Sequence, residues 1–260
     1  MQRRLQGSFA LVLLGIAWPL CAAAQTLTLC YEDADVRPWR MRDRHGLNLT
    51  LIDRAAKASG VTIKYEITAW QRCMADLKAN RVDGAFAASF KEDRLGYGAY
   101  PGGNTPDVSK RLHVERYVVL RKRGSPVDWD GQRFHRLVGP VGTQLGYSIN
   151  DVLQKIGVTT DDGAQSAEAL VQKLIAGYIG AAAMQEGEAH AVLRSQPGRA
   201  ERLEILPRQI EEKPYFLMLS HAFVKTSPEL AERFWKAIET TRSSREYQKE
   251  EREARAAMLR

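Results

Sequence analysis

Long apolar runs, clustered basic residues and paired metal ligands are all scarce in this sequence, and each scarcity argues against a class of protein. After the first two dozen residues, no apolar stretch reaches the ~20 residues of a membrane-spanning helix. The formal net charge is +7, but mixed runs such as "KEEREAR" spread it, whereas a nucleic-acid site needs a basic stripe. The 5 histidines are scattered and form no cysteine–histidine zinc spacing. We therefore expect a soluble protein with no nucleic-acid partner, no metal and no cofactor.

The one apolar run lies at the N-terminus. Arg3 and Arg4 precede the run, which extends from Phe9 to Leu20, and three alanines follow at 22–24. Charged, apolar and small-residue segments in this order are typical of a secretory signal peptide. An uncleaved membrane anchor is the alternative, although the run is short for a span of ~20 residues. We expect residues 1–24 to be a cleaved signal peptide and the mature protein to be periplasmic.

Only 3 cysteines are present. Cys21 follows Leu20, which is not the small residue that precedes a lipid-modified cysteine, so we expect Cys21 to leave with the signal peptide. Cys30 and Cys73 remain, and an even pair in an oxidising compartment favours a disulfide. Two buried free thiols are the alternative, because free cysteine packs as a small apolar residue.

Hydrophobic periodicity in the first part of the mature chain alternates between strand and helix. "TLTLCYED" (26–33) and "VTIKYEI" (61–67) are typical of strands, and "LNLTLIDRAAKASG" (47–60) has helical spacing and ends at a glycine. "WQRCMADLKAN" (70–80) predicts a second helix, and "VDGAFAAS" (82–89) a strand buried on both faces. This order predicts a parallel α/β unit.

The rest of the chain repeats the pattern and then returns. We expect a long strand at 112–122, a buried strand at 136–142, helices at 147–157 and 166–177, and a buried strand at 178–185. Two further strands, at 202–207 and 215–220 with Pro214 at a crossing, precede two amphipathic helices within 227–260.

Two segments share one pattern of residues. "LKANRVDGAF" (77–86) and "LIAGYIGAAA" (174–183) both join the last turn of a helix to a buried strand, but Gly180 stands where Asp83 stands in the first copy. Because this position lies in the turn between helix and strand, we expect the difference to alter local hydrogen bonding and not the choice of ligand.

Five stretches together resemble the amino-acid type of periplasmic solute-binding protein, family 3. They are "GLNLTLIDRAAKASGV", "ITAWQRCMADLKANRVDGAFAASFKEDRLGYGAYP", "VGTQLGYSINDVL", "LVQKLIAGYIGAAAMQEGEA" and "KPYFLMLSHAF". The resemblance implies the type II periplasmic binding fold, with two α/β lobes joined by two hinge strands. Lobe I would comprise 25–112 and 218–260, and lobe II would comprise 113–217.

The resemblance implies a ligand cleft between the lobes, because ligands bind beyond the carboxyl ends of strands in open α/β sheets. Arg94 in "FKEDR" falls where such proteins carry the arginine that clamps the ligand's carboxylate. A guanidinium meets a carboxylate in two parallel hydrogen bonds, which suits this role. The alternative is a surface arginine paired with Glu92 or Asp93.

Further lobe I residues are candidates for ligand contact. Trp70 matches a cleft aromatic of the family, and Trp39 lies in the loop where another sits; either is otherwise a core residue. Ser89 ends the buried strand and offers a hydroxyl, or caps a helix. Asp33 and Asp35 end the first strand and would meet a ligand ammonium, or serve as turn residues.

In lobe II the candidates surround the start of one predicted helix. Thr143, Gly146, Tyr147 and Ser148 precede or open it, and free backbone N–H groups at a helix start suit an anionic group. Plain capping by Ser148 is the alternative and is compatible with this role.

One position departs from the family. Amino-acid binders place an aspartate after the second buried strand to pair with the α-ammonium, and here Gln185 stands there with Glu186 next to it. Either Glu186 turns inward, or the ligand lacks an α-ammonium.

The resemblance implies a monomeric, non-enzymatic receptor that delivers a small polar solute, an amino acid or related carboxylate, to the permease of an ABC importer. Hinge closure around the solute would make the shape that the permease reads. Two alternatives share this fold: a cyclohexadienyl dehydratase-like enzyme, for which Glu186 is the one candidate acid, and an input module of a membrane signalling protein.

Overall fold

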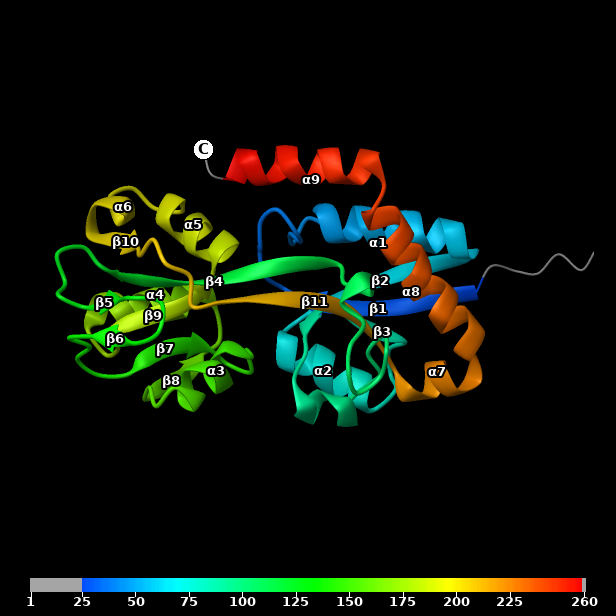
Figure 1. The fold of residues 1–260 in the computed structure, drawn as a ribbon, viewed down its shortest axis with the longest axis horizontal. Helices are drawn as coiled ribbons and strands as arrows, with labels where there is room; N and C mark the ends of the chain where they lie inside the picture. Colours follow the sequence, from blue (N-terminus) through cyan, green and yellow to red (C-terminus); the bar gives the residue numbers. More distant parts are fainter. Residues whose placement is uncertain (1–24, 259–260) are drawn as a thin grey trace, which may run out of the picture.

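The computed structural model describes residues 25–258, and nine of its strands form one twisted sheet with a lobe at either end (Figure 1), while two short strands form a separate hairpin. The strand order is β2-β1-β3-β11-β4-β9-β7-β8, with β10 paired to β4. The predicted signal peptide, with Cys21, lies outside the described residues. The two-lobed α/β fold predicted from the sequence is confirmed.

Lobe I is built on three parallel strands, and its helices lie on both faces of them. β1 pairs with both β2 and β3, as expected of a strand–helix–strand unit. The elements are β1 (Gln25–Glu32), α1 (Leu47–Ser59), β2 (Val61–Thr68), α2 (Trp70–Lys78), β3 (Gly84–Ser89), the 3₁₀ turns Glu92–Gly96 and Val108–Lys110, and the C-terminal helices α7 (His221–Thr226), α8 (Pro228–Arg242) and α9 (Arg245–Met258).

Lobe II repeats the design with shorter elements. Here β7 pairs in parallel with both β8 and β9. The elements are β5 (Asp128–Trp129), β6 (Phe134–His135), β7 (Val141–Gln144), α3 (Ile149–Lys155), β8 (Thr160–Ala164), α4 (Ala167–Ala176), β9 (Ala181–Gln185), α5 (Glu186–Arg194), α6 (Arg199–Arg202) and β10 (Leu203–Ile205). The β5–β6 hairpin, β8 and the helices α5, α6 and α7 were not predicted, because short segments carry little periodicity.

Two long strands join the lobes. β4 (His113–Lys122) and β11 (Glu211–Leu219) run antiparallel, from Glu211 opposite Tyr117 to Tyr215 opposite His113. β11 continues into lobe I beside β3, while β4 continues into lobe II beside β9. These are the predicted hinge strands, and the predicted lobe boundaries, at 112/113 and 217/218, fall at the start of β4 and near the end of β11.

Both faces of the lobe II sheet are buried. Along β4, Tyr117 and Val119 pack into one apolar cluster, and Val118 and Leu120 pack into another. The first cluster continues under the hinge strands into lobe I, and the second fills the space between the sheet and α4 and α5. A strand covered on both faces has a nearly continuous apolar sequence, which is why these strands were recognisable.

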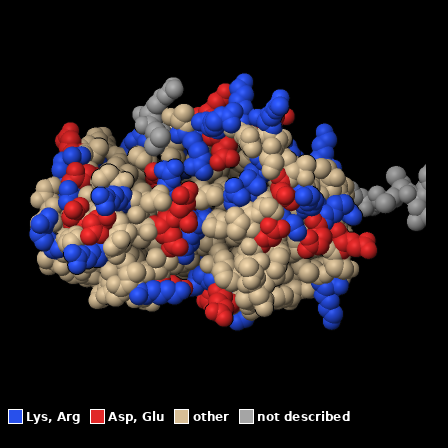
Figure 2. Space-filling model, in the orientation of Figure 1, with Lys and Arg blue, Asp and Glu red and all other residues tan. Residues whose placement is uncertain are grey.

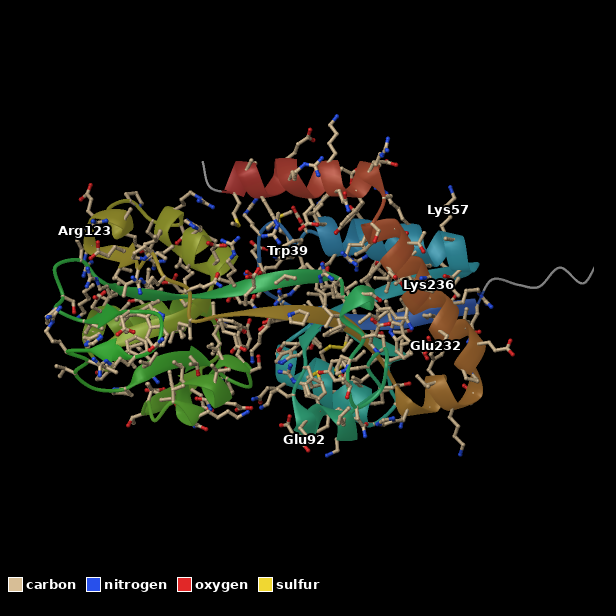
Figure 3. The ribbon with its side chains drawn as sticks, in the orientation of Figure 1. Trp39, Lys57, Glu92, Arg123, Glu232 and Lys236 are labelled. Atoms are coloured by element: carbon tan, nitrogen blue, oxygen red, sulfur yellow. A yellow bond between two sulfur atoms is a disulfide. The ribbon has the colours of Figure 1, made fainter. Side chains whose placement is uncertain are left out.

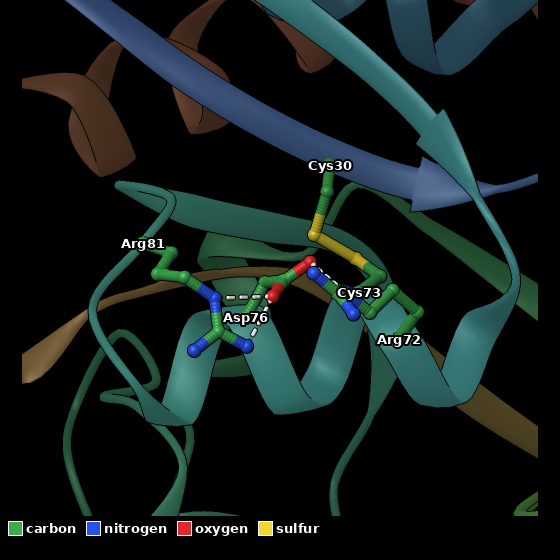
Figure 4. Close-up of a disulfide and its surroundings, with 5 residues drawn as sticks. All are labelled: Cys30, Arg72, Cys73, Asp76 and Arg81. Carbon is green, nitrogen blue, oxygen red and sulfur yellow. Dashed lines mark hydrogen bonds and ion pairs between the residues drawn. A yellow bond between two sulfur atoms is a disulfide. The ribbon is translucent and has the colours of Figure 1, made fainter.

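The predicted disulfide is confirmed. Cys30 on β1 is bonded to Cys73 on α2 (Figure 4), with a Cα–Cα distance of 5.6 Å. Both cysteines are buried, and the bridge closes a loop with a sequence separation of 43 residues between the first strand and the second helix. Beside it, the Asp76 carboxylate accepts hydrogen bonds from both Arg72 and Arg81.

The repeated segments also adopt matching turns. Asn80 and Gly177, which follow α2 and α4, both have positive φ, of 54° and 84°. In the first copy, Asp83 accepts a hydrogen bond from the Thr28 backbone N–H at 2.8 Å. In the second, Gly180 lies so close to the Val138 carbonyl that a Cβ would come within 2.3 Å of the oxygen. The loss of the acidic residue therefore follows from close backbone packing in lobe II.

The last helix reaches both lobes. α9 crosses above the hinge strands toward α5 (Figure 1). Arg255 donates to the Val114 carbonyl of β4 at 3.2 Å, and Arg194 of α5 donates to the Met258 carbonyl at 3.1 Å. No helix of residues 25–258 is both long and apolar enough to cross a membrane.

Candidate functional site

A small cavity lies between the lobes where β3, the loop after β7 and the hinge strands meet. Its volume is about 20 Å³, room for about one water molecule. Six lobe I residues line it: Glu32, Arg40, Trp70, Ala87, Ser89 and Arg94. They face a lobe II and hinge wall of Tyr117, Tyr147, Ser148, Gln185 and Tyr215. Six of the twelve candidate ligand residues therefore meet at this inner cavity: Trp70, Ser89, Arg94, Tyr147, Ser148 and Gln185.

Arg94 is the central cation of the inner cavity. It is 5% exposed and lies over the Trp70 ring, with its guanidinium carbon 5.3 Å from the ring centre. Nη1 donates to the Ser89 carbonyl at 2.8 Å, and Nη2 to the Gly146 carbonyl at 3.0 Å. Among residues 25–258 no carboxylate forms an ion pair with Arg94. The surface pairing with Glu92 or Asp93, which the sequence left open, is absent.

The two lobes touch through polar side chains around this cavity. The hydroxyls of Ser89 and Ser148 are 2.8 Å apart, and the Tyr147 hydroxyl donates to Glu32 at 2.7 Å. With the Arg94–Gly146 bond, these contacts hold the lobes closed on one another. A solute larger than water enters only when some of these cross-cleft bonds break.

Gln185 ends β9, and its amide nitrogen is hydrogen-bonded to a hinge strand. Its amide nitrogen donates to the Tyr215 hydroxyl at 2.9 Å, and the Tyr215 hydroxyl is 2.8 Å from that of Tyr117. The amide oxygen is buried without a partner among the described residues. Gln185 therefore presents a neutral acceptor to the cavity, in place of the carboxylate that would balance an ammonium.

The backbone of β3 is distorted where it borders the cavity. Ala87 has φ 61°, and the pairing of β11 with β3 shifts register between Phe216 and Leu217. Positive φ raises the conformational energy of any residue other than glycine, and such strained residues are concentrated at functional sites. The bulge turns Ala87 and Ser89 toward the cleft, and no sequence pattern signalled it.

A larger outer cavity opens beside the inner one. It has a volume of about 580 Å³, within the range of small-molecule sites. Glu32, Trp70 and Tyr147 line both cavities, so the Tyr147–Glu32 hydrogen bond forms part of the wall between them. Carboxylates of Asp33, Asp35, Glu168 and Glu188 line the outer cavity alone.

Four predicted residues lie elsewhere. Trp39 is buried 4.2 Å from the His113 ring and is covered by Arg255 of α9, beneath that helix in Figure 3. Thr143 is buried in β7 and lines neither cavity. Glu186 faces Arg116 at 3.8 Å in a separate hollow behind the hinge, and so does not turn into the cleft. Asp33 lies at the mouth of the outer cavity, paired with Arg42.

Sequence reasoning missed several cavity residues. Glu32 and Arg40 form a buried ion pair. Burial by itself would lower the pKa of Arg40, but the Glu32 carboxylate beside it outweighs this effect and raises the pKa. Tyr117 and Tyr215 come from the hinge strands, which were predicted as strands without any residue of theirs being named as a ligand contact. Glu188 lies one helical turn beyond Gln185, on the inward face of α5; helical spacing from Gln185 was the signal that would have found it.

The hinge itself contains two buried titratable residues. His113 and Glu115 are alternate residues of β4, both nearly unexposed. Burial raises the pKa of Glu115 to about 8, with further effects from Arg255, Glu186 and Arg40. Burial, with Arg40 and Arg255 nearby, holds the pKa of His113 well below its usual value. Both groups are therefore neutral in the folded protein near neutral pH.

We expect Glu115 to make stability fall as the pH rises. The folded state keeps a carboxyl proton that the unfolded chain has already released, so the free energy of unfolding decreases by about 1.4 kcal/mol per pH unit up to a pKa of about 8. His113 acts in the opposite direction below about pH 6.5. Above that pH the buried carboxyl of Glu188 acts in the same direction as Glu115, so removing Glu115 should flatten the profile by the contribution of one carboxyl group. Denaturant titrations over this range should give a flatter profile for Glu115→Gln than for the natural chain. The exposed Glu212→Gln serves as control, and parallel profiles for Glu115→Gln and the natural chain would contradict the assignment.

Lysines, arginines and carboxylates are interspersed over the face shown in Figure 2. This agrees with the mixed-sign runs of the sequence, and no patch of one sign dominates this face.

No family model and no curated protein sequence matches this chain. Solved structures with the same fold do. An ancestral arginine-binding protein bound to glutamine is 19% identical, with a TM-score of 0.68 over 88% of this chain and 97% of its own. A histidine kinase sensor domain with similarity to periplasmic binding proteins is 17% identical, with a TM-score of 0.69 over 89% and 96%.

A third structure is that of an ancestral amino acid-binding protein that is a precursor of cyclohexadienyl dehydratase. It is 15% identical, with a TM-score of 0.65 over 88% of this chain and 95% of its own. At these identities the likeness establishes the fold, which is the two-lobed periplasmic binding fold that the sequence predicted.

Proposed function

We propose that this protein is an extracytoplasmic receptor that captures a small carboxylate-bearing solute, such as an amino acid, between its lobes and delivers it to an ABC importer. It acts as a monomer, catalyses no reaction, and releases the solute to a permease in the inner membrane. Family 3 membership, the signal peptide and the periplasmic location belong to this proposal.

The observation that carries the proposal is the isolated charge of Arg94. Burying a cation without an anionic partner costs several kcal/mol, so proteins rarely do so unless a ligand supplies the anion. Ser89 and Ser148 place one hydroxyl from each lobe beside it. A carboxylate bound to Arg94 and both hydroxyls would replace the direct contact between the lobes with a solute-mediated one, which is how closure becomes dependent on the solute.

A thermal-shift screen of amino acids, polyamines, organic acids and sugars tests the proposal. A solute at about a hundred times its dissociation constant stabilises the folded protein by ~2.7 kcal/mol. We expect shifts from carboxylates and none from neutral sugars. Shifts confined to compounds without a carboxylate would overturn it, and so would no shift from any compound.

Two other functions are candidates on the same fold. One similar structure is a histidine kinase sensor domain, and another is an amino acid-binding protein described as a precursor of cyclohexadienyl dehydratase. A sensor input module would bind the solute equally well but would be encoded beside a signalling gene and not beside a permease and an ATPase. A dehydratase would convert its ligand, so chromatography of the bound solute after long incubation separates it from a receptor. Glu186, the acid considered from sequence, faces Arg116 outside the cleft.

A further inference from the structure

The cleft holds a second buried ionisable group without an opposite partner, at the far side of the wall from Arg94. Glu188 of α5 is 2% exposed and lines the outer cavity. Its Oε1 accepts a hydrogen bond from the Gln144 amide at 3.2 Å, while Oε2 is buried with no partner among the described residues. No lysine, arginine or histidine of residues 25–258 forms an ion pair with it.

The other acidic residues around the outer cavity are satisfied or exposed. Glu32 is paired with Arg40, Glu168 with Arg199, and Asp33 with Arg42. Glu188 is therefore the carboxyl group with an oxygen, Oε2, that still lacks a donor. Gln144 Oε1 is also buried and unpartnered, so two residues that line the same cavity each carry a free acceptor.

We propose that Glu188 binds a cationic group of the solute, and that this group is an ammonium or guanidinium held well away from the carboxylate on Arg94. The inference rests on the proposed function. Arg94 lines the inner cavity and Glu188 the outer one, with Trp70, Tyr147 and Glu32 between them. A solute that spans both passes between the two aromatic rings after the Tyr147–Glu32 bond opens.

The same arrangement explains the glutamine at position 185. A neutral amide oxygen offers an ammonium a weaker hydrogen bond than a carboxylate does. The structure thus assigns the anionic contact to position 188, one helical turn further along α5. The solute class is an ω-amino or guanidino acid, in which an α-ammonium is not required.

Binding of the cation should release a proton from Glu188. The groups facing Glu188 are Glu32 and Arg40 from lobe I, Gln144 and Tyr147 from β7 and the loop after it, and Glu115 from β4. Burial and the neighbouring Glu32 raise the pKa of Glu188 above its usual value, so its carboxyl is largely protonated near neutral pH. A bound cation favours the carboxylate and expels that proton, so the affinity for the cationic solute rises with pH across neutrality.

Calorimetric titration with matched compounds tests the inference. The set pairs γ-aminobutyrate, δ-aminovalerate and ε-aminocaproate with the α-amino isomer and the plain carboxylate of the same chain length. We expect at least one ω-amino acid to bind about tenfold or more tighter than both its partners. In Glu188→Gln this preference should vanish while the plain carboxylate still binds. Glu186→Gln, on the same helix with its carboxylate outside the cleft, should keep it.

Proton release measured on the natural protein tests the inference without a variant, so the test does not depend on whether Glu188→Gln folds. In buffers of different ionisation enthalpy, the ω-amino acid should release close to one proton near pH 7 and the plain carboxylate none. Equal affinity for all three compounds of every set would overturn the inference and leave the carboxylate receptor standing. So would a preference that persists in Glu188→Gln. If no compound of any set binds, the proposed function itself fails.

Discussion

Arg94→Ala should weaken the binding of carboxylate solutes by about a thousandfold, because removing one partner of a buried charge pair costs 3–5 kcal/mol. The loss has two sources. The solute forfeits a charge-assisted, two-pronged contact, and its carboxylate would then be buried against neutral hydroxyls. Arg94→Lys should recover part of the affinity, since an ammonium keeps the charge and loses the planar fork.

The fold should tolerate this substitution. The Ser89 carbonyl keeps the Tyr100 hydroxyl as a donor at 2.7 Å when the guanidinium is gone, so only the Gly146 carbonyl loses its partner. Calorimetry gives the affinity, and thermal unfolding without solute shows whether the fold has suffered. Arg72→Ala is the matched control, because Arg72 lies on the exposed side of α2 and pairs with Asp76. Unchanged affinity in Arg94→Ala would remove the guanidinium from the site.

Strongly periodic segments were predictable from sequence, and distortions were not. The long strand at 112–122 and the helix at 166–177 showed their periods over ten residues or so, and both are present with small shifts at their ends. β8 was not predictable, since "TDDGA" has no alternation and Ala164 is its one apolar residue. It forms because β7 offers it a parallel partner, which is a tertiary effect that no local pattern records.

The residues of the site also fall into those that the sequence predicted and those that it did not. Arg94, Ser89 and Ser148 follow a strand or open a helix, positions where a side chain faces the cleft in any two-lobed α/β protein, and they meet at the inner cavity. Glu32 and Glu188 looked like surface acids. Their burial depends on how far the lobes approach, because Tyr147 of one lobe covers Glu32 of the other. A sequence read one lobe at a time cannot show a contact made by closing two.

That approach also depends on one glycine, and Gly187→Ala should weaken solute binding by about a thousandfold by keeping the lobes apart. Gly187 is the second residue of α5 in lobe II, and it packs against the loop after β1 in lobe I. A Cβ at this position would lie 2.0 Å from the Arg37 carbonyl oxygen. No real contact is so short, and the obstacle is backbone, which cannot rotate out of the way as a side chain can. The lobes must therefore separate, and the hydroxyl of Ser148 and the carboxyl of Glu188 move away from a solute held by Arg94.

The substitution leaves each lobe intact, which makes it a test of closure alone. Gly187 has no positive φ and lies in a helix, where alanine is favoured over glycine by up to about 1 kcal/mol. Thermal stability without solute should therefore be unchanged or slightly higher while affinity collapses. Small-angle scattering with saturating solute should show a more extended particle than for the natural chain. Gly96→Ala, where a Cβ meets nothing within 4 Å, is the matched control. A Gly187→Ala protein that binds normally and is equally compact would show that the solute is held without this close approach of the lobes.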